Sequence, residues 1–341
     1  MSSGTNTGRR PVGVRIAGTG SALPSRRLTN ADLEKMMETS DEWIVQRTGI
    51  RERRIMDREK GESTSQLAAD SLKLALADAR LTAADLDLII VATMTAEMSC
   101  PASASLVANL VGAGDCGAFD LTAACSGFVY GLNVAHDLIK GGAYRTIGLI
   151  GADALSTLMR YDNLGRSTSI IFGDAAGAAI IKATDDTSKG ILAQSMHSDG
   201  KGWKEIYVPR CKQDFPQGVE FDENKIEHVQ MNGASVFKFA VGTFPKLIEQ
   251  TLEEAKVSAP DVDMYVCHQS NQRILTAARE RFGLPEDKLY INIDRYGNTV
   301  AASVPLCLDE LRRSGRVREG HKVMFVAFGG GLTWGSSLWQ L

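Results

Sequence analysis

Short apolar runs alternate with helical patterns along this chain. Runs rich in β-branched and other apolar residues predict buried strands at residues 86–93, 146–150, 169–172, 264–267 and 322–327. Between them, apolar residues recur at helical spacing, as in residues 65–79 and 244–255. Strands that alternate with helices indicate an α/β protein with largely parallel sheets.

The chain also resembles itself. At a shift of 176, residues 75–87 (ALADARLTAADLD) align with 251–263 (TLEEAKVSAPDVD), and each copy is typical of a helix, a turn and a strand. Residues 147–149 align with 323–325 at the same shift, whereas 138–142 align with 311–315 at a shift of 173. Chance similarity is the alternative, but the return of nearly the same shift over three stretches disfavours it. We therefore predict two duplicated α/β halves, residues 1–187 and 188–341.

Ligands of such sheets bind at the carboxyl ends of parallel strands, and Cys125 is predicted to lie at one. It follows an apolar strand end and precedes a helical pattern at residues 128–139. The N-terminus of a helix favours a thiolate, and the small neighbours of Cys125 allow a sharp, accessible turn. An inert buried thiol is the more common state of a cysteine, and we assign that state to the other five.

Two further polar residues are predicted near Cys125. His268 ends the predicted strand 264–267 and matches Ala92 at the shift of 176, which makes it a candidate base or hydrogen-bond donor. Asn298 matches Cys125 at the shift of 173, so we expect the two at equivalent loop ends that face a common axis. The triple glycine 329–331 follows a predicted strand and allows backbone N–H groups to turn toward a ligand oxygen.

Composition and charge narrow the possible functions. A hydrophobic fraction of 44% in 341 residues excludes disordered and fibrous classes, and a net charge of -3 gives no overall basic field for nucleic acid. No apolar run approaches the roughly 20 residues that span a bilayer. The six cysteines form no CxxC pair and no zinc spacing. We expect a protein of the reducing cytoplasm that binds no metal, nucleic acid or membrane.

Four motifs then identify a family. TAACSGF (122–128), CHQSN (267–271), GNTVAAS (297–303) and FGGGLTWG (328–335), in this order and spacing, resemble β-ketoacyl-[acyl-carrier-protein] synthase III. The resemblance covers nearly the whole chain and includes residues 39–50, 171–174 and 236–238. It implies a thiolase-like α/β fold whose two halves form αβαβα layers. A Cys-His-Asn set distinguishes this branch from the elongating synthases, which use Cys-His-His.

The resemblance implies the initiating reaction of type II fatty acid synthesis. Cys125 would be acylated by an acyl-CoA primer and would then condense with malonyl-acyl carrier protein, with loss of CO2. His268 and Asn298 would donate hydrogen bonds to the enolate oxygen, and the N–H groups of Cys125 and Gly330 would form the oxyanion hole. The CoA thioester is a substrate, and no further cofactor is implied.

The resemblance also assigns binding residues. These are Thr39, Trp43, Arg47, Arg166 and Asn271 for CoA, Cys100 and Phe328 for the acyl pocket, and Lys238, Arg273 and Arg281 for docking of the acidic carrier protein. Trp43 and Arg166 would enclose the adenine, and Arg47 would contact phosphate. A homodimer is implied as well.

Two positions depart from the family pattern. Ala234 stands where some members have an asparagine that contacts CoA. Cys100 stands where several members have a phenylalanine that crosses the dimer interface and closes the acyl pocket. Because cysteine is smaller, we expect a longer pocket that accepts primers beyond acetyl.

Other functions are compatible with some of the same residues. A ketosynthase-III-like enzyme of polyketide or quinolone metabolism fits the same Cys-His-Asn set. A papain-like hydrolase has the same order of residues, but it lacks a reason for the duplication and requires a nearby tryptophan. A dinucleotide-binding oxidoreductase is suggested by Gly18 and Gly20, yet Leu23 occupies the third glycine position and Pro24 follows. An inactive binding protein is disfavoured because every catalytic position is filled.

Overall fold

Two β-sheets form the framework of the protein in the computed structural model, which describes residues 12–341. The first sheet has the order β1-β7-β6-β4-β5 and the second the order β11-β12-β13-β8. Their strands are β1 (Gly13–Ala22), β4 (Leu88–Ala92), β5 (Gly117–Leu121), β6 (Thr146–Asp153), β7 (Ala175–Thr184), β8 (Gly190–Ser198), β11 (Met264–Cys267), β12 (Lys322–Gly329) and β13 (Thr333–Gln340). The chain passes from the first sheet to the second between Thr184 and Gly190.

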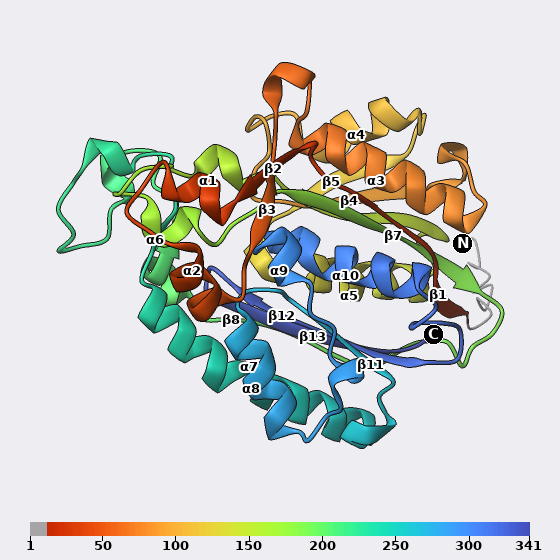
Figure 1. Ribbon diagram of the computed structural model, residues 1–341. Coiled ribbons are helices and arrows are strands. Elements are labelled where there is room, and N and C mark those ends of the chain that lie inside the picture. Colours follow the sequence, from red (N-terminus) through yellow and green to blue (C-terminus); the bar gives the residue numbers. More distant parts are fainter. Residues whose placement is uncertain (1–11) are drawn as a thin grey trace.

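Helices cover both sheets and also separate them (Figure 1). Helices α5 (Gly127–Lys140) and α10 (Ser303–Arg313) lie between the sheets and contact both. The outer face of the first sheet is covered by α3 (Thr64–Ala79) and α4 (Ser103–Val111), and that of the second by α7 (Gly233–Ala255) and α8 (Gln272–Arg281). The predicted αβαβα layering is therefore confirmed. The expectation of largely parallel sheets is wrong, because β1, β7 and β6 pair antiparallel, as do β12, β13 and β8.

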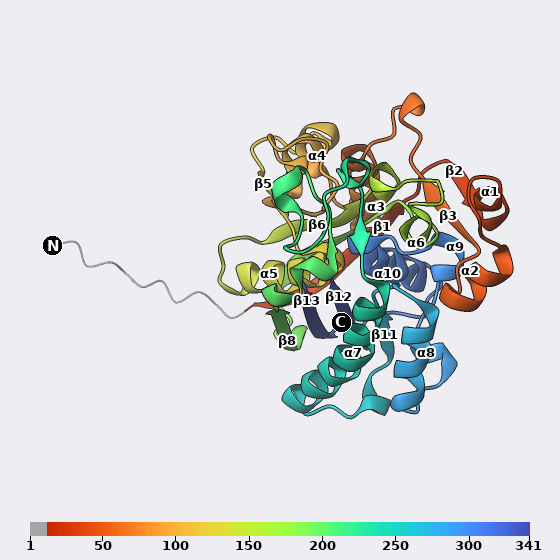
Figure 2. The ribbon, with the colours of Figure 1, turned by 90° about the vertical axis from the view of Figure 1, so that its left-hand side faces the viewer.

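Smaller elements surround the open end of this sandwich. They are β2 (Arg26–Thr29), α1 (Asn30–Glu34), α2 (Asp41–Thr48), β3 (Glu52–Ile55), α6 (Arg166–Ser169), β9 (Ile206–Tyr207), β10 (Gln230–Met231) and α9 (Ile293–Tyr296). Figure 2 shows α2 beside α8, with α7 next to α8. No helix among residues 12–341 has the length and apolar character needed to cross a membrane.

The duplication is visible in strand pairing. Strands β4 and β6 are parallel with Leu88 opposite Ile147, and β11 and β12 are parallel with Met264 opposite Val323, so both partners move by 176 residues. Unusual backbone φ angles repeat at the same shift as well. Ala124 and Val300 have φ angles of 46° and 50°, and they too lie 176 residues apart. Non-glycine residues rarely adopt positive φ, so this pairing supports a common ancestral turn.

That register corrects one sequence-based expectation. The short 3₁₀ helices Ala124–Ser126 and Val300–Ala302 correspond at the shift of 176, which makes Ala301, not Asn298, the counterpart of Cys125. The shift of 173 holds at the ends of α5 and α10, because α5 has 14 residues and α10 has 11. Asn298 instead lies just before the second turn.

The predicted strand at residues 169–172 is also wrong. Ser169 ends helix α6, and Phe172 forms an isolated parallel bridge with Asn298. The apolar run is short and leads directly into Gly173, so a turn is possible there. The strand that follows, β7, was not predicted because its first five residues are Ala or Gly. Small residues carry little β signal, yet the sheet requires them for close packing.

The glycines of the rejected dinucleotide motif have a structural role. Gly18 and Gly20 lie inside β1, paired with β7 rather than in a loop before a helix. A Cβ on Gly18 would lie 2.5 Å from the Ala75 carbonyl oxygen, and one on Gly20 would lie 2.5 Å from the Ala75 nitrogen. These glycines let α3 approach the sheet closely, so the structure gives no support to a nucleotide loop here.

One continuous core joins the halves. Phe128 and Leu132 of α5 and Leu308 of α10 are fully buried, and they pack with Ile90 of the first sheet and Val266 of the second. Burial of each such side chain contributes about 1.5–3 kcal/mol. Both central helices contribute to this shared core, so each half buries the inner face of its sheet against the other half.

Candidate active site

Cys125, His268 and Asn298 line the same cavity of about 120 Å³. The cavity lies between the two halves, where the turns before α5 and α10 meet the carboxyl end of β11. Its wall is mostly apolar and includes Ile171, Phe172, Ile206, Met231, Val236, Phe237, Phe239, Ile274 and Phe328, together with Gly233, Ser270, Asn271, Gly329 and Gly330. The structure thus brings together three residues that are far apart in sequence.

The turn at Cys125 has little spare space. Cys125 is 7% exposed and lies in the 3₁₀ helix that leads directly into α5. A Cβ on Gly127 would lie 3.0 Å from the Ala92 Cβ, and one on Gly329 would lie 2.7 Å from the Cys125 nitrogen. The small residues around the thiol are therefore required by packing as well as by substrate access.

Burial raises the pKa of the Cys125 thiol, and the carboxylate of Asp153 raises it further. The expectation that the helix N-terminus favours a thiolate is therefore not supported for the resting site, because desolvation outweighs it. Burial also raises the pKa of Asp153 to about 7, although the backbone N–H groups of Met94 and Ala301 donate to it. The resting nucleophile is a neutral thiol.

His268 is buried in the wall of the same cavity as Cys125. The side chain is 1% exposed, and burial lowers its pKa to about 3, so the imidazole is neutral. Its Nδ1 lies 2.7 Å from Ser303 Oγ. The ring of Phe328 packs against it edge-on, with ring centroids 5.7 Å apart. A neutral imidazole can donate one hydrogen bond but carries no charge.

Asn298 is fixed at both its backbone and its side chain. Its N–H donates to the Ile171 carbonyl at 2.9 Å, and its carbonyl accepts from Gly173 N–H at 3.0 Å. Its side-chain oxygen Oδ1 accepts from the Val300 N–H at 3.0 Å. This bond assigns the amide orientation. The Nδ2 donors are therefore left for the cavity that Asn298 lines.

The glycine loop after β12 is tied to the turn at Cys125. Thr333 Oγ1 lies 3.1 Å from the Ala123 carbonyl and 3.0 Å from the Gly330 carbonyl. Gly330 and Cys125 line the same cavity. The pair predicted as oxyanion donors is therefore adjacent in space.

Three of the predicted CoA residues gather on one face of α2 and α6. The Arg47 guanidinium lies 4.8 Å from the Trp43 ring centroid, and that of Arg166 lies 5.4 Å from it. Arg166 also donates to the Glu38 carbonyl at 2.8 Å. Thr39 Oγ1 is buried and has no hydrogen-bond partner within residues 12–341, which leaves a polar atom available beside this cluster.

Asn271 joins α2 to α8. Its Nδ2 donates to the Arg47 carbonyl at 2.9 Å, and its Oδ1 accepts from the Arg273 N–H at 2.9 Å as the cap of α8. Asn271 also lines the Cys125 cavity. It therefore connects the predicted CoA surface to the site of chemistry.

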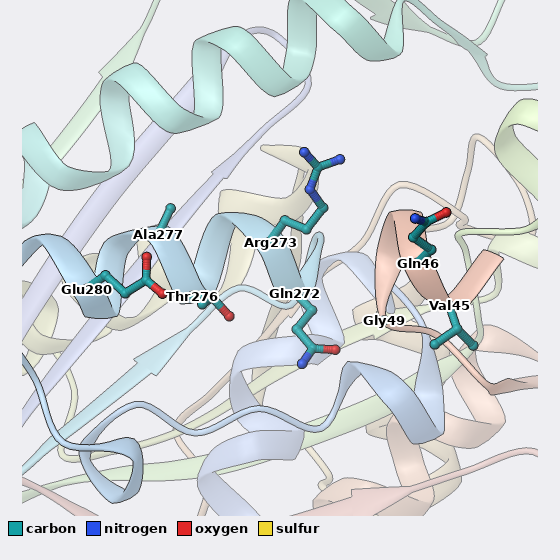
Figure 3. Close-up of a pocket in the computed structure, with 8 residues that line it drawn as sticks. All are labelled: Val45, Gln46, Gly49, Gln272, Arg273, Thr276, Ala277 and Glu280. Atoms are coloured by element: carbon teal, nitrogen blue, oxygen red, sulfur yellow. The ribbon is translucent and has the colours of Figure 1, made fainter. Parts of the chain in front are cut away.

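A groove of about 380 Å³ runs between α2 and α8 (Figure 3). It is lined by Val45, Gln46, Gly49, Gln272, Arg273, Thr276, Ala277 and Glu280. The Arg273 guanidinium lies 5.5 Å from the ring centroid of Phe237, a residue of the Cys125 cavity. Arg273 is exposed and thus lies next to a residue that lines the cavity.

The other predicted docking cations differ in their surroundings. Lys238 is exposed on α7. Arg281 pairs with Glu249 of α7 at 2.8 Å, so its charge is largely compensated. Of the two departures from the family pattern, Ala234 is exposed in the first turn of α7. Cys100 is exposed and is not among the residues that line the cavity of its own chain.

Two residues with a clear structural relation to the site were missed by sequence reasoning. Ser303 contacts His268, and the Val300 N–H fixes the amide of Asn298. Both lie in the GNTVAAS motif, which was the available signal. Their roles depend on contacts that the motif alone does not specify.

Comparisons with known proteins agree with this architecture. Residues 119–200 match the 3-oxoacyl-[acyl-carrier-protein] synthase III family, and residues 252–341 match the C-terminal part of that family. The chain is 45% identical over 327 residues to a β-ketoacyl-[acyl-carrier-protein] synthase III of Caldanaerobacter subterraneus, covering 96% of this chain and 97% of that protein.

Solved structures give the same result. The β-ketoacyl-[acyl-carrier-protein] synthase III of Thermus thermophilus superposes with a TM-score of 0.89 at 39% identity, covering 96% of this chain and 98% of that one. The priming β-ketosynthase of the R1128 polyketide pathway superposes with a TM-score of 0.86 at 32% identity, covering 96% of both chains.

Proposed function

Since the chain belongs to the β-ketoacyl-[acyl-carrier-protein] synthase III family, we propose that Cys125, His268 and Asn298 carry out the two half-reactions of that enzyme. The protein is an acyltransferase that initiates fatty acid synthesis by condensing an acyl-CoA primer with malonyl-acyl carrier protein. The products are 3-oxoacyl-acyl carrier protein, CoA and CO2. The convergence of the three side chains on one small apolar cavity carries the proposal.

Acylation comes first. The Cys125 sulfur attacks the thioester carbonyl of the primer, and the C–S bond to CoA breaks. The thiol proton leaves with the CoA sulfur, so the neutral resting state of Cys125 suits the exchange. The backbone N–H groups of Cys125 and Gly330 stabilise the tetrahedral oxyanion, because they border the same cavity and need no reorganisation.

Condensation follows in the same cavity. The malonyl thioester loses CO2, and the electron pair of the broken C–C bond forms an enolate. His268 and Asn298 each donate one hydrogen bond to the enolate oxygen from neutral groups held at fixed positions. The enolate carbon attacks the acyl carbonyl on Cys125, the C–S bond breaks, and the thiolate takes up a proton.

The surface around Trp43 binds CoA. Arg47 and Arg166 already lie over its ring, and the flat guanidinium of Arg166 can stack on adenine opposite Trp43. Arg47 remains available for phosphate. The unpartnered hydroxyl of Thr39 and the amide of Asn271, which also borders the Cys125 cavity, supply further polar groups for CoA.

The malonyl substrate arrives on an acidic carrier protein. Lys238 and Arg273 are exposed next to residues that line the cavity, and opposite charge accelerates such docking. Arg281 contributes less because Glu249 compensates it.

The active form is a homodimer. Strand β5 is the edge strand of the first sheet. Its Phe119 is 38% exposed, and Met98, in the loop between β4 and α4, is 47% exposed. An unprotected apolar edge favours pairing with a second chain.

All six cysteines are free, and free thiols suit a protein of the reducing cytoplasm.

The proposal is tested by the intact mass of the protein after exposure to a panel of acyl-CoA thioesters. The mass should rise by one acyl group in the wild type and not in Cys125→Ala. Absence of any acyl adduct would overturn the proposal. The polyketide or quinolone alternative is less well supported, because the priming polyketide ketosynthase is 32% identical whereas relatives named for the synthase III reach 45%.

A further inference from the structure

The imidazole of His268 has a hydrogen-bond partner at Nδ1 to which no role has yet been given. Its Nδ1 lies 2.7 Å from the hydroxyl oxygen of Ser303, the first residue of α10. Ser303 is 1% exposed and His268 is 1% exposed, so water does not compete for this contact. The two residues are separated by 35 positions: His268 directly follows β11, and Ser303 begins α10.

The hydroxyl of Ser303 has one further contact. The backbone N–H of Gln269 donates to Ser303 Oγ at 3.3 Å. An N–H can only donate, so it places no demand on the hydroxyl hydrogen. Within residues 12–341, Nδ1 of His268 is the one acceptor recorded for that hydrogen. The hydroxyl therefore donates to Nδ1, because the reverse arrangement would leave a buried O–H without an acceptor.

The Gln269 backbone is itself fixed. The side-chain Nε2 of Gln269 lies 3.0 Å from the carbonyl oxygens of Cys267 and Tyr290, and its Oε1 accepts from the Asn292 N–H at 3.0 Å. Gln269 is 1% exposed. Its backbone N–H is thus held in a constant direction toward Ser303.

Neutral imidazole has a single N–H, so the choice between Nδ1 and Nε2 decides where it can donate. We propose that Ser303 is a positioning residue that holds His268 in the tautomer with the proton on Nε2. The donor then lies on the edge of the ring opposite Ser303, where His268 borders the cavity. This inference rests on the proposed function, in which His268 donates a hydrogen bond to the enolate.

Two donors of the cavity are then set by the same short segment. The Val300 N–H orients the amide of Asn298, and the Ser303 hydroxyl orients the imidazole of His268. Both come from residues 298–303, so the turn before α10 prepares both hydrogen bonds to the enolate. Cys125 is positioned by the equivalent turn of the other half.

The tautomer can be read directly in the wild-type enzyme. Protein labelled with ¹⁵N in its histidine rings should show an unprotonated Nδ1 and a protonated Nε2 for His268 at neutral pH, assigned by comparison with His268→Asn. In Ser303→Ala the Nδ1-protonated form should become populated. A protonated Nδ1 in the wild type would overturn the inference, and this readout requires no activity.

Kinetics give a second readout. Ser303→Ala should slow decarboxylation of malonyl-acyl carrier protein about 10- to 100-fold, by analogy with the loss of an outer partner that orients a metal-binding histidine. Acylation of Cys125 by acyl-CoA should change little, and Ser303→Thr, which retains the hydroxyl, should recover most of the lost rate. Ser71→Ala is the matched control, because Ser71 is equally buried but, among the described residues 12–341, its hydroxyl bonds only to the Ala68 carbonyl within α3.

The outcomes separate the two proposals. Equal loss of both half-reactions in Ser303→Ala, or unchanged decarboxylation, would overturn the role of Ser303. A wild-type enzyme that neither becomes acylated nor decarboxylates the malonyl substrate would overturn the proposed function instead, whatever tautomer His268 shows.

Discussion

Gly329 packs directly on the backbone of Cys125. A Cβ on Gly329 would lie 2.7 Å from the Cys125 nitrogen and 2.9 Å from its Cβ, closer than real carbon contacts allow. Gly329, the last residue of β12, is therefore in close contact with the turn that carries Cys125. Gly330, the second predicted oxyanion donor, follows at once, so its position depends on this contact.

Gly329→Ala should consequently push the glycine loop away from the thiol. We expect Cys125 acylation to fall about 10²–10³-fold, the effect of losing one oxyanion donor, measured as the growth of the acyl adduct by mass. Gly242→Ala is the control. Gly242 lies in α7 with nothing within 4 Å of its Cβ position. This change should leave acylation intact and stabilise the fold by about 0.5–1 kcal/mol. Normal acylation in Gly329→Ala would contradict the predicted oxyanion hole.

Asn298 should matter more for the second half-reaction than for the first. Its Oδ1 is engaged by the Val300 N–H, so Nδ2 is the group that can donate to the cavity. Asn298→Asp keeps an oxygen acceptor but removes the donor and adds negative charge. Decarboxylation of malonyl-acyl carrier protein should fall at least about 10²-fold in Asn298→Ala and further in Asn298→Asp. Acylation by acyl-CoA, followed by mass, should decline less. Equal loss of both steps would argue against this role.

Arg273 should contribute more to carrier-protein docking than Arg281. It is exposed next to a residue that lines the cavity, whereas Arg281 is paired with Glu249. Arg273→Ala should raise KM for malonyl-acyl carrier protein on the order of tenfold, equivalent to about 1.4 kcal/mol, without changing KM for acyl-CoA. The matched control is the double variant Arg281→Ala/Glu249→Ala, which removes a neutral pair. If the double variant were as damaging as Arg273→Ala, the assignment would be wrong.

Cys100 should control primer length from the partner chain. It is exposed and does not line the cavity of its own chain, which is the arrangement required of a residue that acts across a dimer interface. The wild type should accept butyryl- and longer acyl-CoA, and Cys100→Phe should restrict it toward acetyl-CoA. Cys100→Ser is the size-matched control and should leave the range unchanged. A strong wild-type preference for acetyl-CoA in a primer-length series would refute the prediction.

The sequence predicted correctly several elements whose residues carry a periodic apolar pattern. The strand at residues 264–267 coincides with β11, and the helix at 128–139 lies within α5, because buried strands and amphipathic helices leave periodic signals. The strand placed at 169–172 failed because a bridge between Phe172 and Asn298, which are far apart in sequence, decides the conformation there. The duplication was detected, but its register near Cys125 was misread, since the shorter α10 displaces the alignment at its end.

The residues of the site could be predicted from the sequence, but their protonation states and orienting contacts could not. The motifs identified Cys125, His268 and Asn298 as candidates, and the structure places all three in one cavity. The neutral state of the thiol arises from burial, which a sequence does not display. The contact of Ser303 with His268 joins residues 35 positions apart, so no local pattern reveals it.

Two buried groups of the site should impose opposite pH dependences on stability. Burial lowers the pKa of His268 from 6.5 to about 3. As pH falls below 6.5, the unfolded chain therefore binds a proton that the folded chain refuses, and stability is lost. Burial raises the pKa of Asp153 from 3.8 to about 7. Here the folded chain binds the proton first, so acidification from pH 7 toward 4 adds stability.

Removing each group should expose the contribution of the other. Between pH 6.5 and 4, His268→Asn should gain up to about 3 kcal/mol relative to the wild type, because the acid-destabilising group is gone. Asp153→Asn should lose stability relative to the wild type over the same interval. Urea unfolding at several pH values measures both differences, and any constant cost of the substitution cancels from the pH trend. Curves that run parallel to the wild type in both variants would show that neither group titrates in a perturbed state, and would remove burial as the reason for a neutral imidazole at His268.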